Sequence, residues 1–141
     1  MKILVPVDGS DSANRAVDQV IATATLLKDA PQIFLLNVQW NIASGNVKLF
    51  INHETINDYY REQGMAALAS ARKKLDTAGL AYIYHISIGT PAEAIVQYAQ
   101  EQQVDQITMG AQGRGTLSAL LLGSVVSKVL HFAAAPVLIV K

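Results

Sequence analysis

Cysteine is absent from the 141 residues of this chain, and histidine is scarce. The first absence excludes disulfides, zinc sites built on thiolates and enzymes that use a thiol nucleophile. Metal sites built on histidine need clustered side chains, whereas His53, His85 and His131 are scattered and no two stand four residues apart. We therefore expect no metal site made by the protein itself.

An excess of charge is also missing, because eleven Lys and Arg balance eleven Asp and Glu. Nucleic-acid-binding domains usually carry a basic excess, so we expect no nucleic acid partner. No apolar run approaches the ~20 residues that span a bilayer. The first residues, MKILVPVDGSD, become polar too soon for a signal peptide. We expect a cytoplasmic protein that has no membrane partner.

Hydrophobic residues, in contrast, are abundant at 51%, and charged residues amount to 16%. This balance is typical of an α/β domain, in which parallel strands are buried on both faces. It also indicates extra buried surface, as in an oligomer. The length suits one domain over residues 1–141.

Apolar runs and helical spacing alternate along the chain. The runs predict five strands, over residues 2–7, 32–38, 80–88, 104–110 and 136–141. Apolar residues at helical spacing predict four helices, over residues 13–27, 57–78, 89–103 and 124–134. Residues 39–56 have no clear period and predict a long loop, of a kind that is usually functional or mobile. The alternation predicts a doubly wound, five-stranded parallel sheet with four helices.

Ligands of such sheets bind beyond the carboxyl ends of the strands, where the strand order switches direction. Three segments can reach that place. They are the turn after the first strand (Pro6, Val7 and Asp8), the end of the second strand (Val38) and the glycine-rich loop after the fourth.

The glycine-rich loop, GAQGRGTLSALLLGS over residues 110–124, matches neither common phosphate-binding motif. Thr116 stands where a Walker loop requires lysine, and the spacing differs from a Rossmann fingerprint. The pattern Gly110-x2-Gly113-x9-Gly123-Ser124 remains. Glycines let backbone N–H groups converge on an anion or adopt left-handed angles. The start of a helix at Gly123 and Ser124 adds free N–H groups, which favours the binding of a phosphate. The alternative to phosphate binding is that the glycines only turn the chain and Ser124 only caps the helix.

Four stretches resemble the universal stress protein family over the whole chain. They are ILVPVDGS, GTPAEAIVQYA, the glycine pattern and the terminal PVLIVK, and the glycine pattern matches the ATP-binding branch. The resemblance implies the Rossmann-like universal stress protein fold with strand order 3-2-1-4-5. It also implies binding of ATP or AMP, with Mg²⁺ as the counterion of the nucleotide, and a homodimer through strand 136–141.

The resemblance further implies roles for the matching positions, while loop 39–56 varies in the family and receives none. The wall around adenine and ribose comprises Pro6, Val7, Asp8 and Val38, with Met109 and Gly110 on the ribose side. Ribose and phosphates are held by Gly113, Arg114, Gly123, Ser124 and Val125.

Three of the candidate residues have alternative interpretations. Asp8 can accept hydrogen bonds from ribose hydroxyls or from the adenine amino group, or it can serve an Asx turn before the first helix. Arg114 can pair with a phosphate or stand in solvent. Trp40 can stack on a base, although packing over the sheet edge is the favoured interpretation.

The sequence favours a binding protein over an enzyme, because neither Ser10 nor Ser124 has a histidine neighbour in the sequence that would act as its base. The leading hypothesis is a stress-response sensor or regulator that binds adenine nucleotide. The alternatives are a slow ATPase or phosphotransfer protein and a structural dimer without nucleotide.

Overall fold

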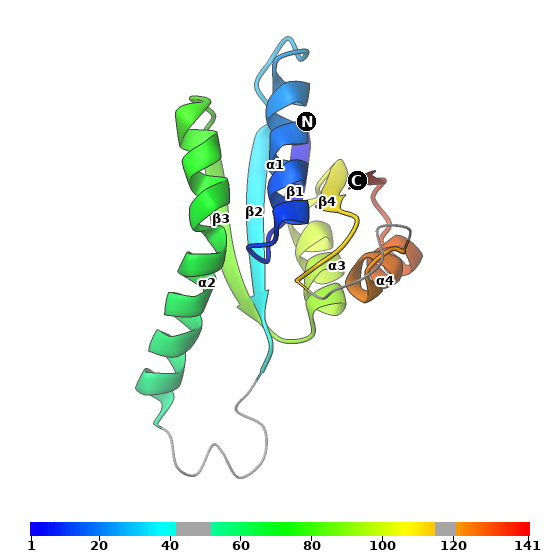
Figure 1. The fold of residues 1–141 in the computed structure, drawn as a ribbon. Helices are drawn as coiled ribbons and strands as arrows, with labels where there is room; N and C mark the ends of the chain where they lie inside the picture. Colours follow the sequence, from blue (N-terminus) through cyan, green and yellow to red (C-terminus); the bar gives the residue numbers. More distant parts are fainter. Residues whose placement is uncertain (42–51, 115–120) are drawn as a thin grey trace.

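A computed structural model describes residues 1–41, 52–114 and 121–141 of the protein. One parallel sheet runs through it in the order β3-β2-β1-β4-β5 (Figure 1). Its strands are β1 (Lys2–Pro6), β2 (Gln32–Gln39), β3 (Tyr82–Ile88), β4 (Gln106–Gly110) and β5 (Val137–Val140). The predicted fold and strand order are confirmed, and β5 lies at an edge of the sheet.

Helices cover both faces of the sheet (Figure 1). They are α1 (Asp11–Ala24), α2 (His53–Thr77), α3 (Pro91–Gln102) and α4 (Ser124–Phe132). The first two pack on one face and the last two on the other. Among the helices of the described residues, none combines the length and apolar character needed to cross a bilayer.

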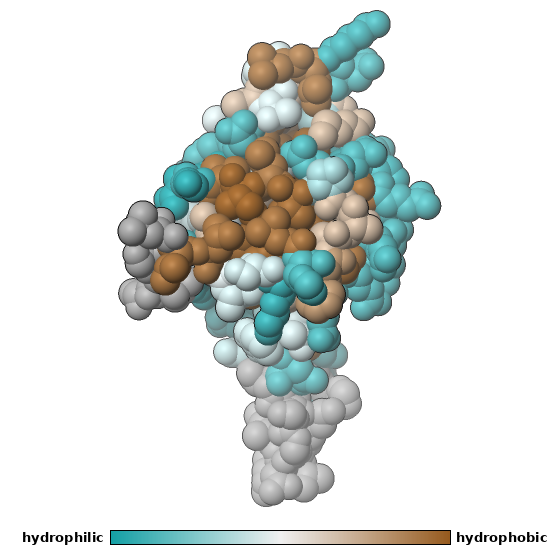
Figure 2. All heavy atoms as spheres, turned by 90° about the vertical axis from the view of Figure 1, so that its right-hand side faces the viewer, coloured by the Kyte–Doolittle hydropathy of each residue, from teal (hydrophilic) through white to brown (hydrophobic). Residues whose placement is uncertain are grey.

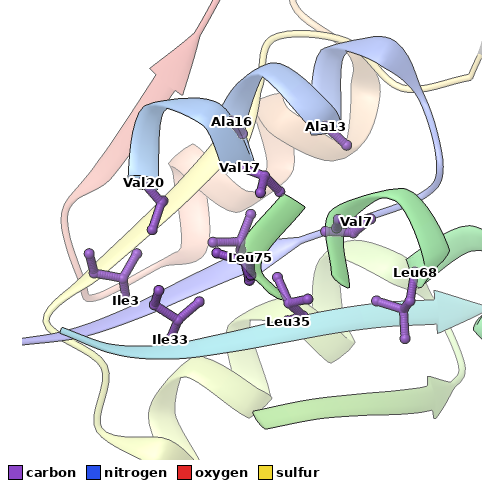
Figure 3. Packing of buried hydrophobic residues seen from close by; sticks show 12 residues of the cluster. Ile3, Val7, Ala13, Ala16, Val17, Val20, Ile33, Leu35, Leu68 and Leu75 are labelled. Carbon is purple, nitrogen blue, oxygen red and sulfur yellow. The ribbon is translucent and has the colours of Figure 1, made fainter. Parts of the chain in front are cut away.

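The sheet is buried on both faces because apolar residues follow one another along its central strands. In β1, Ile3 and Val5 face the layer under α1 and α2, while Leu4 faces the layer under α3 and α4. Figure 3 shows the first layer, in which Val17 of α1 and Leu75 of α2 approach the strands. Continuous apolar strands of this kind are expected in parallel sheets.

Three helix starts differ in detail from the sequence prediction. Helix α1 begins at Asp11, two residues before the predicted residue 13. Helix α2 begins four residues before the predicted Asn57, because the side chain of Asn52 accepts a hydrogen bond from the Thr55 N–H at 2.8 Å. Part of the predicted loop 39–56 is therefore helical. Helix α3 begins at Pro91, two residues after the predicted residue 89, and the side chain of its N-cap Thr90 makes no capping hydrogen bond.

Candidate functional site

The carboxyl ends of β1, β2 and β4 open into a cavity of about 560 Å³. This volume lies within the range of about 300–1,000 Å³ that is usual for small-molecule sites. The cavity lies where the strand order switches direction at β1 and β4, as expected for a doubly wound sheet. All the candidate residues line it, and their contacts with a nucleotide stay a prediction: Pro6, Val7, Asp8, Val38, Met109, Gly110, Gly113, Arg114, Gly123, Ser124 and Val125.

Asp8 follows β1 and directs its two carboxylate oxygens differently. Oδ1 accepts a hydrogen bond from the Ser10 N–H at 2.9 Å, which forms the Asx turn that leads into α1. The other oxygen, Oδ2, faces the glycine-rich loop, since a Cβ added to Gly113 would lie 3.1 Å from it. The two interpretations of Asp8 are therefore compatible, because the turn uses only one of the oxygens.

Gly110, at the end of β4, allows a close approach of α1. A Cβ at this position would overlap the hydroxyl and the backbone carbonyl of Ser12, in the first turn of the helix. The Ser12 hydroxyl is buried there and accepts a hydrogen bond from the Gln112 N–H at 3.2 Å. Gly110 is therefore required by packing, and lining the cavity is a second consequence of its position.

Gly110, Gly113 and Gly123 do not adopt left-handed backbone angles. Among the described residues, positive φ in glycine occurs at Gly9, Gly79 and Gly89 only. A Cβ added to Gly123 would make ordinary contacts of 3.5 Å or more, so the fold tolerates a small side chain there. Close approach, by α1 or by a ligand, is the remaining reason for glycine at these positions.

Helix α4 begins at the cavity with Gly123 as its N-cap, so the interpretation of Ser124 as the cap is wrong. The Gly123 N–H donates to the Ala111 carbonyl at 2.8 Å, which joins the two ends of the loop. Intrahelical bonding starts with the Ser127 N–H, which donates to the Gly123 carbonyl at 3.0 Å. The N–H groups of Ser124 and Val125 precede that bond, at the positive end of the helix dipole. This is an arrangement that can bind an anion.

Arg114 reaches from the loop to the β1–α1 turn. Its Nη2 atom lies 2.7 Å from the position that a Cβ on Gly9 would occupy. Gly9 has a φ of 84°, so glycine is favoured there by conformation as well as by space. Arg114 and Asp8 are the two charged residues on the described part of the cavity wall, which therefore has no net charge.

Several lining residues were missed by sequence reasoning. Asn37 is 2% exposed; its Nδ2 donates to the Val7 carbonyl at 2.8 Å and its Oδ1 accepts from Gln39 Nε2 at 2.7 Å. The available signal was a polar residue inside the apolar run FLLNV. The missed residues are Ala13, Leu36, Asn37, Gln39, Tyr59, Tyr60, Ala67, Pro91, Ile95, Gln112 and Val126.

Trp40 departs from the favoured expectation. Its side chain is 62% exposed and lines the cavity, rather than being packed over the edge of the sheet. His85 and His131 lie elsewhere, His85 stacked on Tyr98 with ring centroids 5.4 Å apart and His131 in the last turn of α4.

Comparison with known proteins identifies the family. The model of the universal stress protein family matches residues 1–141. The chain belongs to this family. Universal stress protein MJ0531 of Methanocaldococcus jannaschii is 32% identical over 144 residues, an alignment that covers 99% of this chain and 81% of that relative.

Solved universal stress protein structures share the fold. The structure of MJ0577, a second universal stress protein of Methanocaldococcus jannaschii, superimposes with a TM-score of 0.85 at 32% identity and covers 99% of this chain and 94% of its own. A universal stress protein family protein from Arabidopsis thaliana, solved with AMP bound, has a TM-score of 0.71 at 21% identity, over 100% of this chain and 91% of its own. The AMP belongs to the Arabidopsis protein, and its likeness to this chain shows a shared fold.

Proposed function

We propose that this universal stress protein binds adenine nucleotide, ATP or AMP, in the cavity at the carboxyl ends of the strands, and that it acts in the cytoplasm as a stress-response sensor or regulator. One observation carries the proposal. Residues from the β1–α1 turn, β2, β4, the glycine-rich loop and the start of α4, selected from sequence motifs, line one cavity of ligand size. Further support comes from the Arabidopsis protein of the same fold, which was solved with AMP bound.

The chemistry of the wall suits the parts of a nucleotide. Val7, Val38 and Met109 offer an apolar surface to a base. Asp8 Oδ2 is an acceptor for ribose hydroxyls. The start of α4 offers N–H groups to phosphates, and Arg114 offers a guanidinium.

Mg²⁺ enters this proposal as the counterion that a nucleotide brings with it. Asp8 is the one carboxylate on the described part of the wall, and no group of three or more metal-binding side chains occurs in the described residues. The phosphates, together with water, would supply most of the ligands of the ion.

Binding without rapid hydrolysis is the mode that we propose. Hydrolysis needs a group that orients a water at the γ-phosphate, and on the described wall Asp8 is the one carboxylate, with no histidine beside it. Multiple-turnover phosphate release separates a sensor from the slow ATPase or phosphotransfer alternative, with Gly113→Val as control because a side chain there would displace the Asp8 carboxylate. Phosphate release that the substitution abolishes would favour the enzyme.

The nucleotide proposal is tested with a pair of variants at Gly123. We expect Gly123→Val to abolish binding of AMP and ATP in calorimetry, because the branched side chain obstructs the space before the α4 N-terminus. Its circular dichroism should be unchanged, since the backbone there (φ −64°, ψ 157°) suits any residue. Gly123→Ala is the control for the fold. Unchanged affinity in folded Gly123→Val would contradict the proposal. Mass spectrometry of natively purified protein, which searches for bound AMP or ATP, adds an independent test.

A homodimer through residues 136–141 is the second part of the proposal. The alternative of a structural dimer without nucleotide shares this interface, so nucleotide binding is what separates the two. Strand β5 pairs with β4 alone among the described strands, so its outer edge is open to another strand. Figure 2 shows a broad apolar surface on the side of the molecule that carries α4 and β5. Leu130 and Phe132 of α4 and Leu138 of β5 are exposed at 42%, 66% and 39%. Apolar surface of this kind marks an interaction site.

A further inference from the structure

We infer that Trp40 is a base-stacking residue of the cavity, in contact with the planar face of the purine. The inference rests on the proposed nucleotide site and adds to it the residue that recognises the base by stacking. Three observations carry it: the place of Trp40 directly after β2, its exposure, and the residues that line the cavity with it.

Trp40 directly follows strand β2, which ends at Gln39. The backbone just before it is held by the sheet, since Gln39 is in register with Ile88 and its carbonyl accepts the Gly89 N–H at 2.9 Å. The backbone that leads into Trp40 is therefore fixed by the sheet.

The exposure of Trp40 leaves its ring available. The side chain is 62% exposed although it lines the cavity, and none of the aromatic pairs among the described residues includes it. Covering this apolar area with a ligand is favourable, roughly in proportion to the area removed from water. Indole is the largest aromatic side chain and pairs well with planar rings.

The cavity that Trp40 lines also offers an apolar surface to a base. Pro91 and Ile95 of α3 contribute to its wall, as does Val38 of β2. The charged residues of the wall, Asp8 and Arg114, belong to the β1–α1 turn and the glycine-rich loop. The polar parts of a nucleotide are thus matched there, and the base is matched at the end of β2.

The experiment exploits the fact that Trp40 is the one tryptophan of the chain. Indole fluorescence should change as AMP is added to the full chain and should saturate together with the heat of binding. Trp40→Ala should weaken AMP about tenfold, the effect typical of removing one stacked aromatic, and Trp40→Phe should retain part of the affinity. Affinity for ribose 5-phosphate, measured by competition with labelled AMP, should not change, because this ligand has no base.

The outcomes separate this inference from the proposed function. AMP binding with constant fluorescence and an unchanged Trp40→Ala affinity would overturn the inference and leave the nucleotide site standing. Equal weakening of AMP and ribose 5-phosphate would also overturn it, because it would mean that Trp40 supports the shape of the cavity. If the wild-type protein binds neither AMP nor ATP, the inference and the proposed function both fail.

Discussion

Asp8 allows its structural and ligand-binding roles to be separated by two substitutions. Asn retains an Oδ1 acceptor for the Ser10 N–H but removes the charge, whereas Ala removes both. In urea denaturation, we expect the free energy of unfolding of Asp8→Asn to lie within about 0.5 kcal/mol of the wild-type value. The free energy of unfolding of Asp8→Ala should fall by about 1 kcal/mol, because the turn hydrogen bond is lost. In calorimetry both should bind AMP at least about tenfold more weakly, because a hydrogen bond to a charged group contributes roughly 1.5–3 kcal/mol. Wild-type affinity in Asp8→Asn would limit Asp8 to its role in the turn.

Gly110 and Gly123 belong to the same motif but should respond differently to alanine. At Gly110 the added methyl group overlaps Ser12, so we expect Gly110→Ala to lower the free energy of unfolding by about 1–3 kcal/mol, as overpacking does. At Gly123 the methyl group meets ordinary contact distances, and the free energy should change by less than about 0.5 kcal/mol. Urea denaturation of both variants checks this difference. Equal stability of the two would mean that the first turn of α1 moves away from β4 at little cost.

Residues of the site could be predicted where short motifs follow strands, and could not where packing alone brings them together. Asp8 and Gly113 stand in such motifs, and the structure brings both to the cavity. Tyr59 and Ile95 also reach it, but only because α2 and α3 pack on opposite faces of the sheet. No local spacing encodes that approach, since it depends on the whole strand order.

Elements could be predicted in kind and order, while their ends depended on partners distant in sequence. Strand β4 begins at Gln106, where it pairs with Ile3, and not at the predicted Val104. Val104 remains apolar and buried, so the hydrophobic pattern extends beyond the hydrogen-bonded ladder. The predicted loop 39–56 is too long at its end, because the cap at Asn52 starts α2 within it. Asparagine is a known helix-start signal, but the lack of apolar periodicity in this stretch outweighed it.

Strand β5 carries the prediction that belongs to a single element. Leu138 is exposed on this edge strand, whereas Val137 and Ile139 pack against the core. We expect Leu138→Lys to convert a dimer into a folded monomer, because a charged side chain at a paired strand edge opposes association. Deletion of residues 136–141 should instead give a monomer or aggregate with a damaged core.

Light scattering at micromolar concentration measures the result, and Leu26→Lys is the matched control. Leu26 is 85% exposed and follows α1, so the same change of charge there should leave the dimer intact. A stable monomer of the wild-type protein under these conditions would refute the proposed interface.

The charge balance of the whole molecule is repeated on a small scale in the cavity. The chain has a formal net charge of zero, and the described wall carries one cation, Arg114, and one anion, Asp8. Long-range attraction of a polyphosphate is therefore weak. Binding energy should come mostly from the apolar surface and from hydrogen bonds to adenosine and the first phosphate.

AMP and ATP should consequently bind with similar strength. A helix terminus contributes on the order of 0.3–1 kcal/mol to an anion at an exposed site, and one charge-assisted hydrogen bond from Arg114 adds roughly 1.5–3 kcal/mol. Phosphates that extend beyond these groups reach solvent, where salt screens their charge. We expect ATP to exceed AMP by about tenfold or less, roughly 1.4 kcal/mol, in calorimetry of ATP, ADP and AMP on one preparation. A preference for ATP of several hundredfold would require a further site for the γ-phosphate. Lys48, which lies outside the described residues, is the candidate for it. The ATPase or switch hypothesis would then take precedence.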